Sequence, residues 1–163
     1  MHEIGTRPIA TQRLLLRRVT AADAVAIFTN WAQNAEVTQY LDWRPHADIN
    51  VTRQVVAEWL TELERGDYFH WVIELAETHA VIGSIGAVGL NKAQDVVEVG
   101  YCLAKPYWGW GIMSEALSAV IDYLLVEAAL KEVEACHHPD NSASGRVMQK
   151  SGMRFKGIRP NVK

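Results

Sequence analysis

The sequence predicts a single α/β or α+β domain built on a mixed sheet. Short β-type runs alternate with longer segments whose apolar residues recur every three or four positions, in the order β-α-α-β-β-β-α-β-α-β. The chain has 163 residues, which suits one domain that buries a core. Its composition, 49% hydrophobic and 21% charged, is ordinary for a globular protein. No repeat or low-complexity linker divides the chain.

The first half predicts one strand, two helices and a hairpin. Residues 13–18 form the strand, and Thr20 starts a capping-box-like turn into a helix with apolar spacing. A second helix begins near Asp48 and ends near Gly66. The hairpin has arms at residues 69–75 and 81–90, and the glycines of its second arm are typical of bulges or close packing.

The second half predicts strands and helices in alternation. Residues 96–103 form a strand, which leads through a glycine turn into a long helix from about Ile112 to about Leu130. Residues 131–137 form another strand, and the stretch 141–144 is rich in capping residues that begin a short helix ending near Gly152. A last strand is expected at residues 153–157.

Charge and cysteine content limit the function classes. The formal net charge of −3 gives no electrostatic support for binding nucleic acid. No apolar run approaches the roughly 20 residues that span a bilayer, and residues 1–10 lack the apolar stretch of a signal peptide. Cys102 and Cys136 fall inside predicted strands, which favours reduced thiols over a disulfide or a catalytic thiol. We therefore expect a cytoplasmic protein without nucleic-acid or membrane partners.

The most informative segment is residues 106–117, PYWGWGIMSEAL, between a strand and a long helix. Glycines let the backbone approach an anion, and the first turn of a helix offers unpaired N–H groups at its positive end. A phosphate-binding P-loop is excluded because Ile112 and Met113 stand where Lys and Ser/Thr belong, and Ser114 replaces the third glycine of a dinucleotide fingerprint. The pattern predicts a phosphorylated cofactor; a tight corner without ligand is the alternative.

Four blocks of the chain, in order, resemble a GNAT-superfamily N-acetyltransferase of the RimJ/RimL-like (ribosomal-protein N-acetyltransferase type) branch. The blocks are TQRLLLR at 11–17, VIGSIG at 81–86, EVGY at 98–101 with YWGWG and EA at 107–116, and NSAS at 141–144 with KSGM at 150–153. The resemblance implies a GNAT-like fold, with a mixed, mostly antiparallel sheet flanked by helices.

The chain departs from the family pattern in three places. Pro106 occupies the Gln/Arg position of the phosphate loop, and Trp110 stands where a cation is common. Residues 1–163 are expected to be a single acyl-CoA N-acyltransferase domain that lacks the usual last C-terminal strand. An uncovered edge strand favours pairing with a second chain, so a homodimer is one expected partner state.

The resemblance implies acetyl-CoA as donor and a primary amine, either a peptide N-terminus or a small molecule, as acceptor. The pyrophosphate would lie on the amides near the two glycines, and the pantetheine arm would follow the open edge of strand 96–103. The implied cofactor-binding residues are Leu103, Ala104, Trp108, Gly109, Trp110, Gly111, Ile112, Met113, Asn141, Ser144, Arg146 and Lys150. No metal is expected, because the adjacent His137 and His138 would point to opposite faces.

The resemblance also suggests catalytic roles. Glu98 is the first candidate for the base that takes the proton of the acceptor ammonium, with His137 and His138 as alternatives. Ser144, beside Asn141, matches the residue that assists the leaving thiolate, and Tyr101 is a weaker candidate acid. Each has a plainer interpretation: a solvent-facing carboxylate for Glu98, and helix capping for Asn141 and Ser144.

Trp43, Trp71 and Tyr101 are candidate acceptor-site residues, with ordinary packing as the alternative for the two tryptophans. Asp42 and Asp48 are candidate partners of a cationic acceptor. Two function classes therefore stay open. One is a catalytic amine acetyltransferase, and the other is an acyl-CoA-binding or sensor protein of the same fold without turnover.

Overall fold

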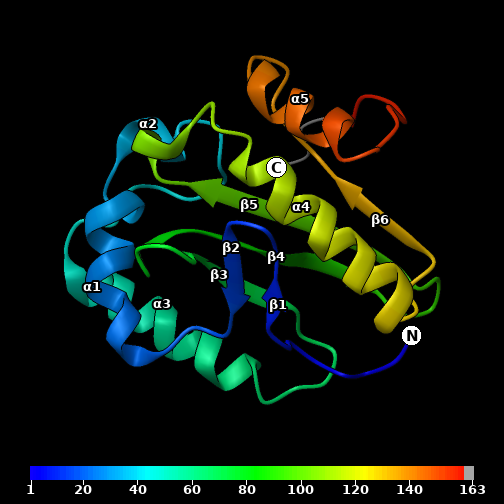
Figure 1. Cartoon of the computed structure of the whole chain (residues 1–163), viewed down its shortest axis with the longest axis horizontal. Coiled ribbons are helices and arrows are strands. Elements are labelled where there is room, and N and C mark those ends of the chain that lie inside the picture. The colour runs from blue at the N-terminus through cyan, green and yellow to red at the C-terminus, as the bar shows by residue number, and fades with distance from the viewer. Residues whose placement is uncertain (160–163) are drawn as a thin grey trace.

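The computed structural model describes residues 1–159, which fold around one six-stranded sheet whose strands lie in sequence order, β1 to β6 (Figure 1). All neighbouring strands are antiparallel except β5 and β6, which run parallel. The strands are β1 (Ile9–Ala10), β2 (Leu14–Arg17), β3 (His70–Leu75), β4 (Val81–Asn91), β5 (Val96–Leu103) and β6 (Glu132–Ala135). The mixed, mostly antiparallel sheet predicted from the sequence is thus confirmed.

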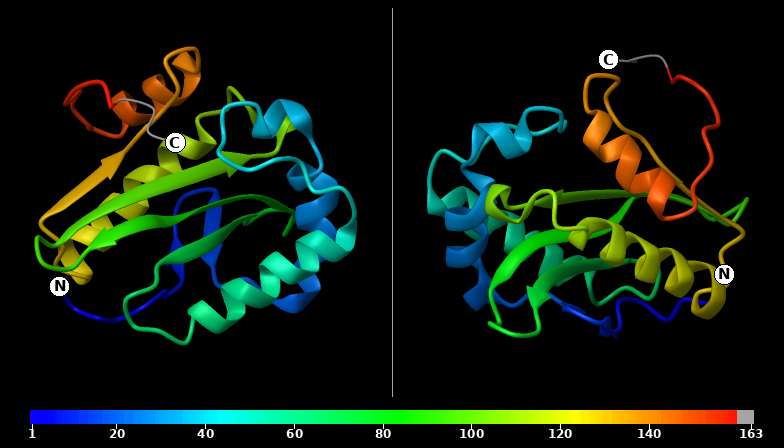
Figure 2. Two further views of the ribbon diagram at one scale, coloured as in Figure 1. Left: turned by 180° about the vertical axis from the view of Figure 1, so that it is seen from behind. Right: turned by 45° about the horizontal axis from the view of Figure 1, so that its top comes forward.

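Helices cover both faces of this sheet (Figure 2). The α-helices are α1 (Ala24–Ile27), α2 (Ala35–Thr38), α3 (Ile49–Glu62), α4 (Ile112–Asp122) and α5 (Ser142–Lys150). Single turns of 3₁₀-helix are η1 (Ala21–Asp23) and η3 (Lys105–Tyr107), and π-helical segments are η2 (Phe28–Ala32) and η4 (Tyr123–Glu127). Within the described residues, no helix is both long and apolar enough to cross a bilayer.

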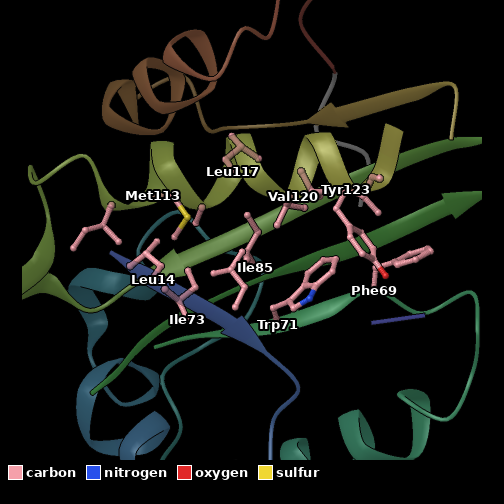
Figure 3. Close-up of a cluster of buried hydrophobic side chains, with 14 of the residues drawn as sticks. Leu14, Phe69, Trp71, Ile73, Ile85, Met113, Leu117, Val120 and Tyr123 are labelled. Carbon is pink, nitrogen blue, oxygen red and sulfur yellow. The ribbon is translucent and has the colours of Figure 1, made fainter. Parts of the chain in front are cut away.

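Two apolar cores hold the layers together, because successive strand residues point to opposite faces. Trp71 and Ile73 of β3 point toward α4 and pack with Leu117 and Val120 (Figure 3). Val72, between them, points to the other face and packs with Ile27 of α1 and residues of α3. The face of the sheet to which a strand residue points therefore decides in which of the two cores it packs.

Most predicted elements are confirmed, but the strand expected at residues 153–157 is wrong. Residues 153–159 form no strand and pair with none in the described part of the chain. Instead, the Lys156 ammonium lies 2.9 Å from Glu132 and 2.7 Å from Glu134 on β6. Side-chain ion pairs, and not a backbone ladder, hold this segment. The short strand β1 and helix α2 are present although no sequence pattern predicted them.

The parallel pair β5–β6 separates partway along its length. Pairing runs from Val96–Glu132 to Val99–Ala135 and then stops, while β5 continues to Leu103. The edge of β5 from residue 100 onward therefore lacks a strand neighbour on this side within residues 1–159. This opening lies next to the turn into α4, and it defines the candidate site (Figure 1).

Candidate active site

The open edge of β5 presents unpaired backbone groups. The Ala104 N–H donates to the Ile82 carbonyl of β4 at 2.7 Å, so that amide points away from the opening. Successive residues of an antiparallel strand direct their amides to opposite sides, and Leu103 and Tyr101 therefore direct theirs into the opening. The Leu103 carbonyl already accepts from the indole N–H of Trp108 at 2.8 Å. The amides of Leu103 and Tyr101 can still donate hydrogen bonds to an extended ligand.

The turn after β5 collects free amides at the start of α4. Gly109 and Gly111 have φ values of +81° and +75°, a left-handed conformation that glycine adopts without strain. Gly111 is the N-cap of α4, and no oxygen within residues 1–159 accepts from the amides of residues 109–114. The Trp108 amide differs, because it donates to the Lys105 carbonyl at 3.1 Å. The run of free amides therefore begins at Gly109, and the Trp108 amide is not part of it.

A clamp from the turn between β1 and β2 fixes this turn. The Glu115 carboxylate on α4 accepts from the Thr11 hydroxyl at 2.6 Å and from the Arg13 amide and Nε at 2.9 and 2.8 Å. Arg13 Nη1 also donates to the Trp110 carbonyl at 2.9 Å. Burial alone would raise the pKa of Glu115, but the hydrogen bonds from Thr11 and Arg13 outweigh burial and lower it. Glu115 thus stays ionised beside the turn and is neutralised locally by Arg13.

The clamp was missed in the roles assigned from the sequence. Thr11, Arg13 and Glu115 belong to motif blocks that the sequence analysis used only for the resemblance. The signal available in the sequence is a carboxylate in the first turn of a helix, beside amides expected to bind a phosphate, because two neighbouring anions repel each other unless a cation neutralises one of them. The partner lies more than one hundred positions away, which no local pattern reveals.

Tyr101 and Ser144 meet at the opening. The Tyr101 hydroxyl lies 2.7 Å from the Ser144 hydroxyl and donates to the Ser144 carbonyl at 3.2 Å. Burial raises the pKa of Tyr101, and the hydrogen bond with Ser144 offsets part of that rise, so the phenol stays protonated at neutral pH. Asn141 is the N-cap of α5, and its side-chain oxygen accepts from the Ser144 amide at 3.2 Å. Its capping role is confirmed.

Glu98 and Tyr101 lie on opposite faces of β5. Its neighbours Val97 and Val99 belong to the core under α4, so Glu98 points the other way, whereas Tyr101 points toward α4. The Glu98 carboxylate accepts from the Arg159 guanidinium. It borders an acidic groove of about 440 Å³ whose lining includes Glu132, Glu134 and Lys156. The Cys136 thiol also donates to Oε1 of Glu98, the oxygen that Arg159 contacts, and the sequence analysis anticipated neither contact.

The two histidines after β6 contact different parts of the chain. The His137 ring packs against Gly145 of α5, where an added β-carbon would come within 2.9 Å of Nε2. The His138 ring stacks on Tyr40 with centroids 5.2 Å apart. No group of three His, Cys, Asp or Glu side chains in the described residues is placed to hold a metal ion.

The structure corrects part of the predicted acceptor site. Trp71 is fully buried in the core under α4, and its indole N–H donates to the Arg7 carbonyl at 2.7 Å, so it cannot contact an acceptor. Trp43 is half-buried beside His46, with ring centroids 5.2 Å apart. The Asp48 carboxylate caps α3 by accepting from the Asn50 amide at 2.8 Å. Arg146 contacts Ser142, one helical turn earlier, and Lys150 is exposed in the last turn of α5.

An open strand edge that leads into an anion-binding helix start is the arrangement of an enzyme that binds an extended, phosphorylated acyl carrier. Residues 13–154 match the acetyltransferase (GNAT) domain family. The chain therefore belongs to the GNAT acetyltransferases, which use acetyl-CoA.

Three relatives illustrate the match. An uncharacterized N-acetyltransferase of Bacillus subtilis, YoaA, is 31% identical over 150 residues, covering 92% of this chain and 84% of the relative. N-acetyltransferase p20 of Bacillus licheniformis is 30% identical over 149 residues, covering 91% and 83%. The Escherichia coli enzyme named ribosomal protein uS5 alanine N-acetyltransferase is 23% identical over 157 residues, covering 91% and 79%.

Solved structures agree with the fold. A GNAT-family acetyltransferase from Bacillus anthracis has a TM-score of 0.81 at 26% identity, covering 93% of this chain and 86% of that chain. A RimL ribosomal L7/L12 N-acetyltransferase in complex with coenzyme A has a TM-score of 0.84 at 22% identity, covering 93% and 86%. At this identity, the second likeness supports the fold alone.

Proposed function

We propose that this chain transfers the acetyl group of acetyl-CoA to a primary amine by direct attack, and that residues 1–163 form one acyl-CoA N-acyltransferase domain of the cytoplasm. The main support for the proposal is that two sets of backbone groups, each without a partner within residues 1–159, lie next to each other. The open edge of β5 at Tyr101 and Leu103 runs into the free amides of residues 109–114. One surface suits an extended pantetheine arm, and the other suits a diphosphate.

The chemistry follows from this placement. A β5 amide that points into the opening would polarise the thioester carbonyl and stabilise the oxyanion formed on attack. Glu98, released from Arg159, would take a proton from the acceptor ammonium. Ser144, hydrogen-bonded to Tyr101, would donate to the departing thiolate. Asn141 would support this step by holding the first turn of α5.

The remaining contacts are assigned by proximity to these surfaces. Leu103 and Ala104 would flank the arm, and Arg146 and Lys150 of α5 would approach the 3′-phosphate. The amides of Gly109, Trp110, Gly111, Ile112 and Met113 would hold the diphosphate. Trp108 would act through its indole and not through its amide, because that amide is already bonded within η3.

We propose a protein N-terminus as the acceptor. The uS5 relative is named for an alanine N-terminus, and the RimL structure is named for a ribosomal protein. Trp43 and Tyr101 remain the candidate aromatic contacts of this acceptor. A small amine is the competing acceptor class. A homodimer is part of the proposal because the outer edge of β6 has no strand neighbour within residues 1–159.

The test combines binding with turnover. Isothermal titration with coenzyme A should give saturable binding, and thiol release from acetyl-CoA should appear with alanine- or serine-initiated peptides. Thiol release with polyamines but with no peptide would show that the acceptor is a small amine, while the acetyl-transfer reaction would stand. Binding without thiol release for any amine would support an acyl-CoA-binding protein instead. Absence of coenzyme A binding by folded protein would refute both functions.

A further inference from the structure

Trp108 and Trp110 flank Gly109 and differ in their contacts. The Trp108 indole is tied to the β5 edge through the Leu103 carbonyl. The Trp110 side chain is 60% exposed, and its indole N–H has no partner within residues 1–159. Tyr107 contacts it with ring centroids 5.8 Å apart and planes inclined by 69°. Such an edge contact covers at most one face, so an indole face stays open to solvent.

The backbone that carries Trp110 is held in place although its side chain is not. Arg13 Nη1 binds the Trp110 carbonyl at 2.9 Å, and Glu115 holds Arg13. Gly109 and Gly111, on either side, are both in the left-handed region. The turn therefore presents one large aromatic ring from a fixed position beside the free amides of residues 109–114.

The direction of the cofactor determines what meets this ring. A diphosphate on the amides of residues 109–114 has two substituents. The pantetheine arm leaves toward the open edge of β5, at Leu103 and Tyr101. The nucleoside leaves from the other end of the diphosphate, and Trp110, in the same turn, offers it an exposed aromatic ring.

We propose that Trp110 is a stacking platform for the purine base of the acyl carrier. This inference rests on the proposed function and adds a nucleobase contact to it. Base–aromatic stacking needs only an open ring face, and its free energy resembles that of one good polar contact.

The test separates the nucleoside end of the cofactor from the arm and the diphosphate. Coenzyme A and pantetheine 4′-diphosphate, which keeps the arm and the diphosphate but lacks the adenosine and its 3′-phosphate, are titrated against each variant. Trp110→Ala should weaken coenzyme A binding roughly tenfold and leave pantetheine 4′-diphosphate binding within about twofold. Trp110→Phe should retain most of the coenzyme A affinity, because its ring still stacks. Phe155→Ala, which removes an aromatic ring that is 82% exposed elsewhere, is the matched control and should change neither.

The outcomes distinguish the two proposals. Equal weakening of both ligands by Trp110→Ala would mean that the residue supports the turn only, and unchanged binding of both would mean that the ring is idle. Either result overturns the stacking and keeps the acetyltransferase proposal. If the wild-type chain bound neither ligand, the proposed function itself would fall, and the stacking with it.

Discussion

Among single side chains, Glu98 shows how one contact changes an assignment. Its position on β5 agrees with that of a base, but its carboxylate is paired with Arg159 from the segment that follows α5. A cation from the chain itself therefore already pairs with this carboxylate. If Glu98 is the base, the acceptor ammonium competes with Arg159 for it.

Glu98→Gln should lower kcat by a factor of about 100 or more while leaving the affinity for coenzyme A unchanged, because the residue faces away from the cofactor side of β5. Stopped-flow thiol release and calorimetry measure the two quantities. Glu132→Gln is the control, since this carboxylate borders the same groove and pairs with Lys156. An unaltered kcat and pH–rate profile in the Glu98 variant would remove it as base.

Tyr101→Phe should reduce turnover by about tenfold, the loss expected for one hydrogen bond. The hydroxyl that orients Ser144 disappears, while the ring and its packing remain. Because burial raises the pKa of Tyr101, the wild-type phenol stays protonated and the effect should be constant between pH 7 and about 9. Comparison with Ser144→Ala and the double variant tests the coupling. Additive effects of the two changes would show that the hydroxyls act independently.

Among the secondary elements, the turn from β5 into α4 depends on both local and distant residues. The two glycines provide the left-handed conformations, and the Thr11–Arg13–Glu115 clamp provides the position of the turn against β2. The glycines alone would leave the turn free to adopt other shapes. A preorganised turn holds its amides toward the anion before the ligand arrives, which lowers the entropic cost of binding.

Gly111→Val should abolish measurable coenzyme A binding. An added β-carbon would lie 3.6 Å from Arg13 Nη2, which is ordinary contact, so crowding within the protein is not the cause. The φ of +75° is the cause, because a β-branched residue there is strained and the turn would change shape. Calorimetry measures the loss. Gly89→Ala on β4 is the control, since its φ lies outside the left-handed region and its nearest neighbour is 4.0 Å away. Wild-type affinity in the Gly111 variant would show that the turn does not bind the diphosphate.

Across the whole molecule, one buried histidine links stability to pH. The His70 side chain lies between Trp59 and Tyr68, and its Nδ1 is buried without a hydrogen-bond partner within residues 1–159. Burial lowers the pKa of His70 to about 4, from 6.5 in the unfolded chain. Between these values the unfolded state binds a proton and the folded state does not, so stability falls as the pH falls.

The free energy of unfolding should therefore drop by about 3 kcal/mol from this residue between pH 7 and pH 4. His70→Phe keeps an aromatic ring beside Trp59 and removes the titration. Whatever its stability at pH 7, this variant should show a smaller decrease in urea-unfolding free energy on acidification. His79→Gln, at an exposed position, should keep the wild-type dependence. Parallel curves for wild type and the His70 variant would contradict the assignment.

The divergence of β5 and β6 is likewise a property of the whole fold. It arises where the parallel pairing stops at Val99 and Ala135, and where α5 brings Ser144 to Tyr101 across the opening. The sequence indicates both strands by their β-type residues. Their separation depends on how α4 and α5 pack against the sheet, which is a long-range outcome.

The sequence by itself determined what depends on neighbouring residues: strand and helix periodicity, the capping of α5 by Asn141, and the left-handed turn at Gly109 and Gly111. Only the tertiary structure decided which partners meet. It buried Trp71, paired Glu98 with Arg159 and joined Arg13 to Glu115. The physical reason is the separation along the chain over which each interaction acts. Backbone sterics and side-chain spacing act over a few residues, whereas the facing side of a strand and the partner of a charge depend on sheet register and packing between distant segments.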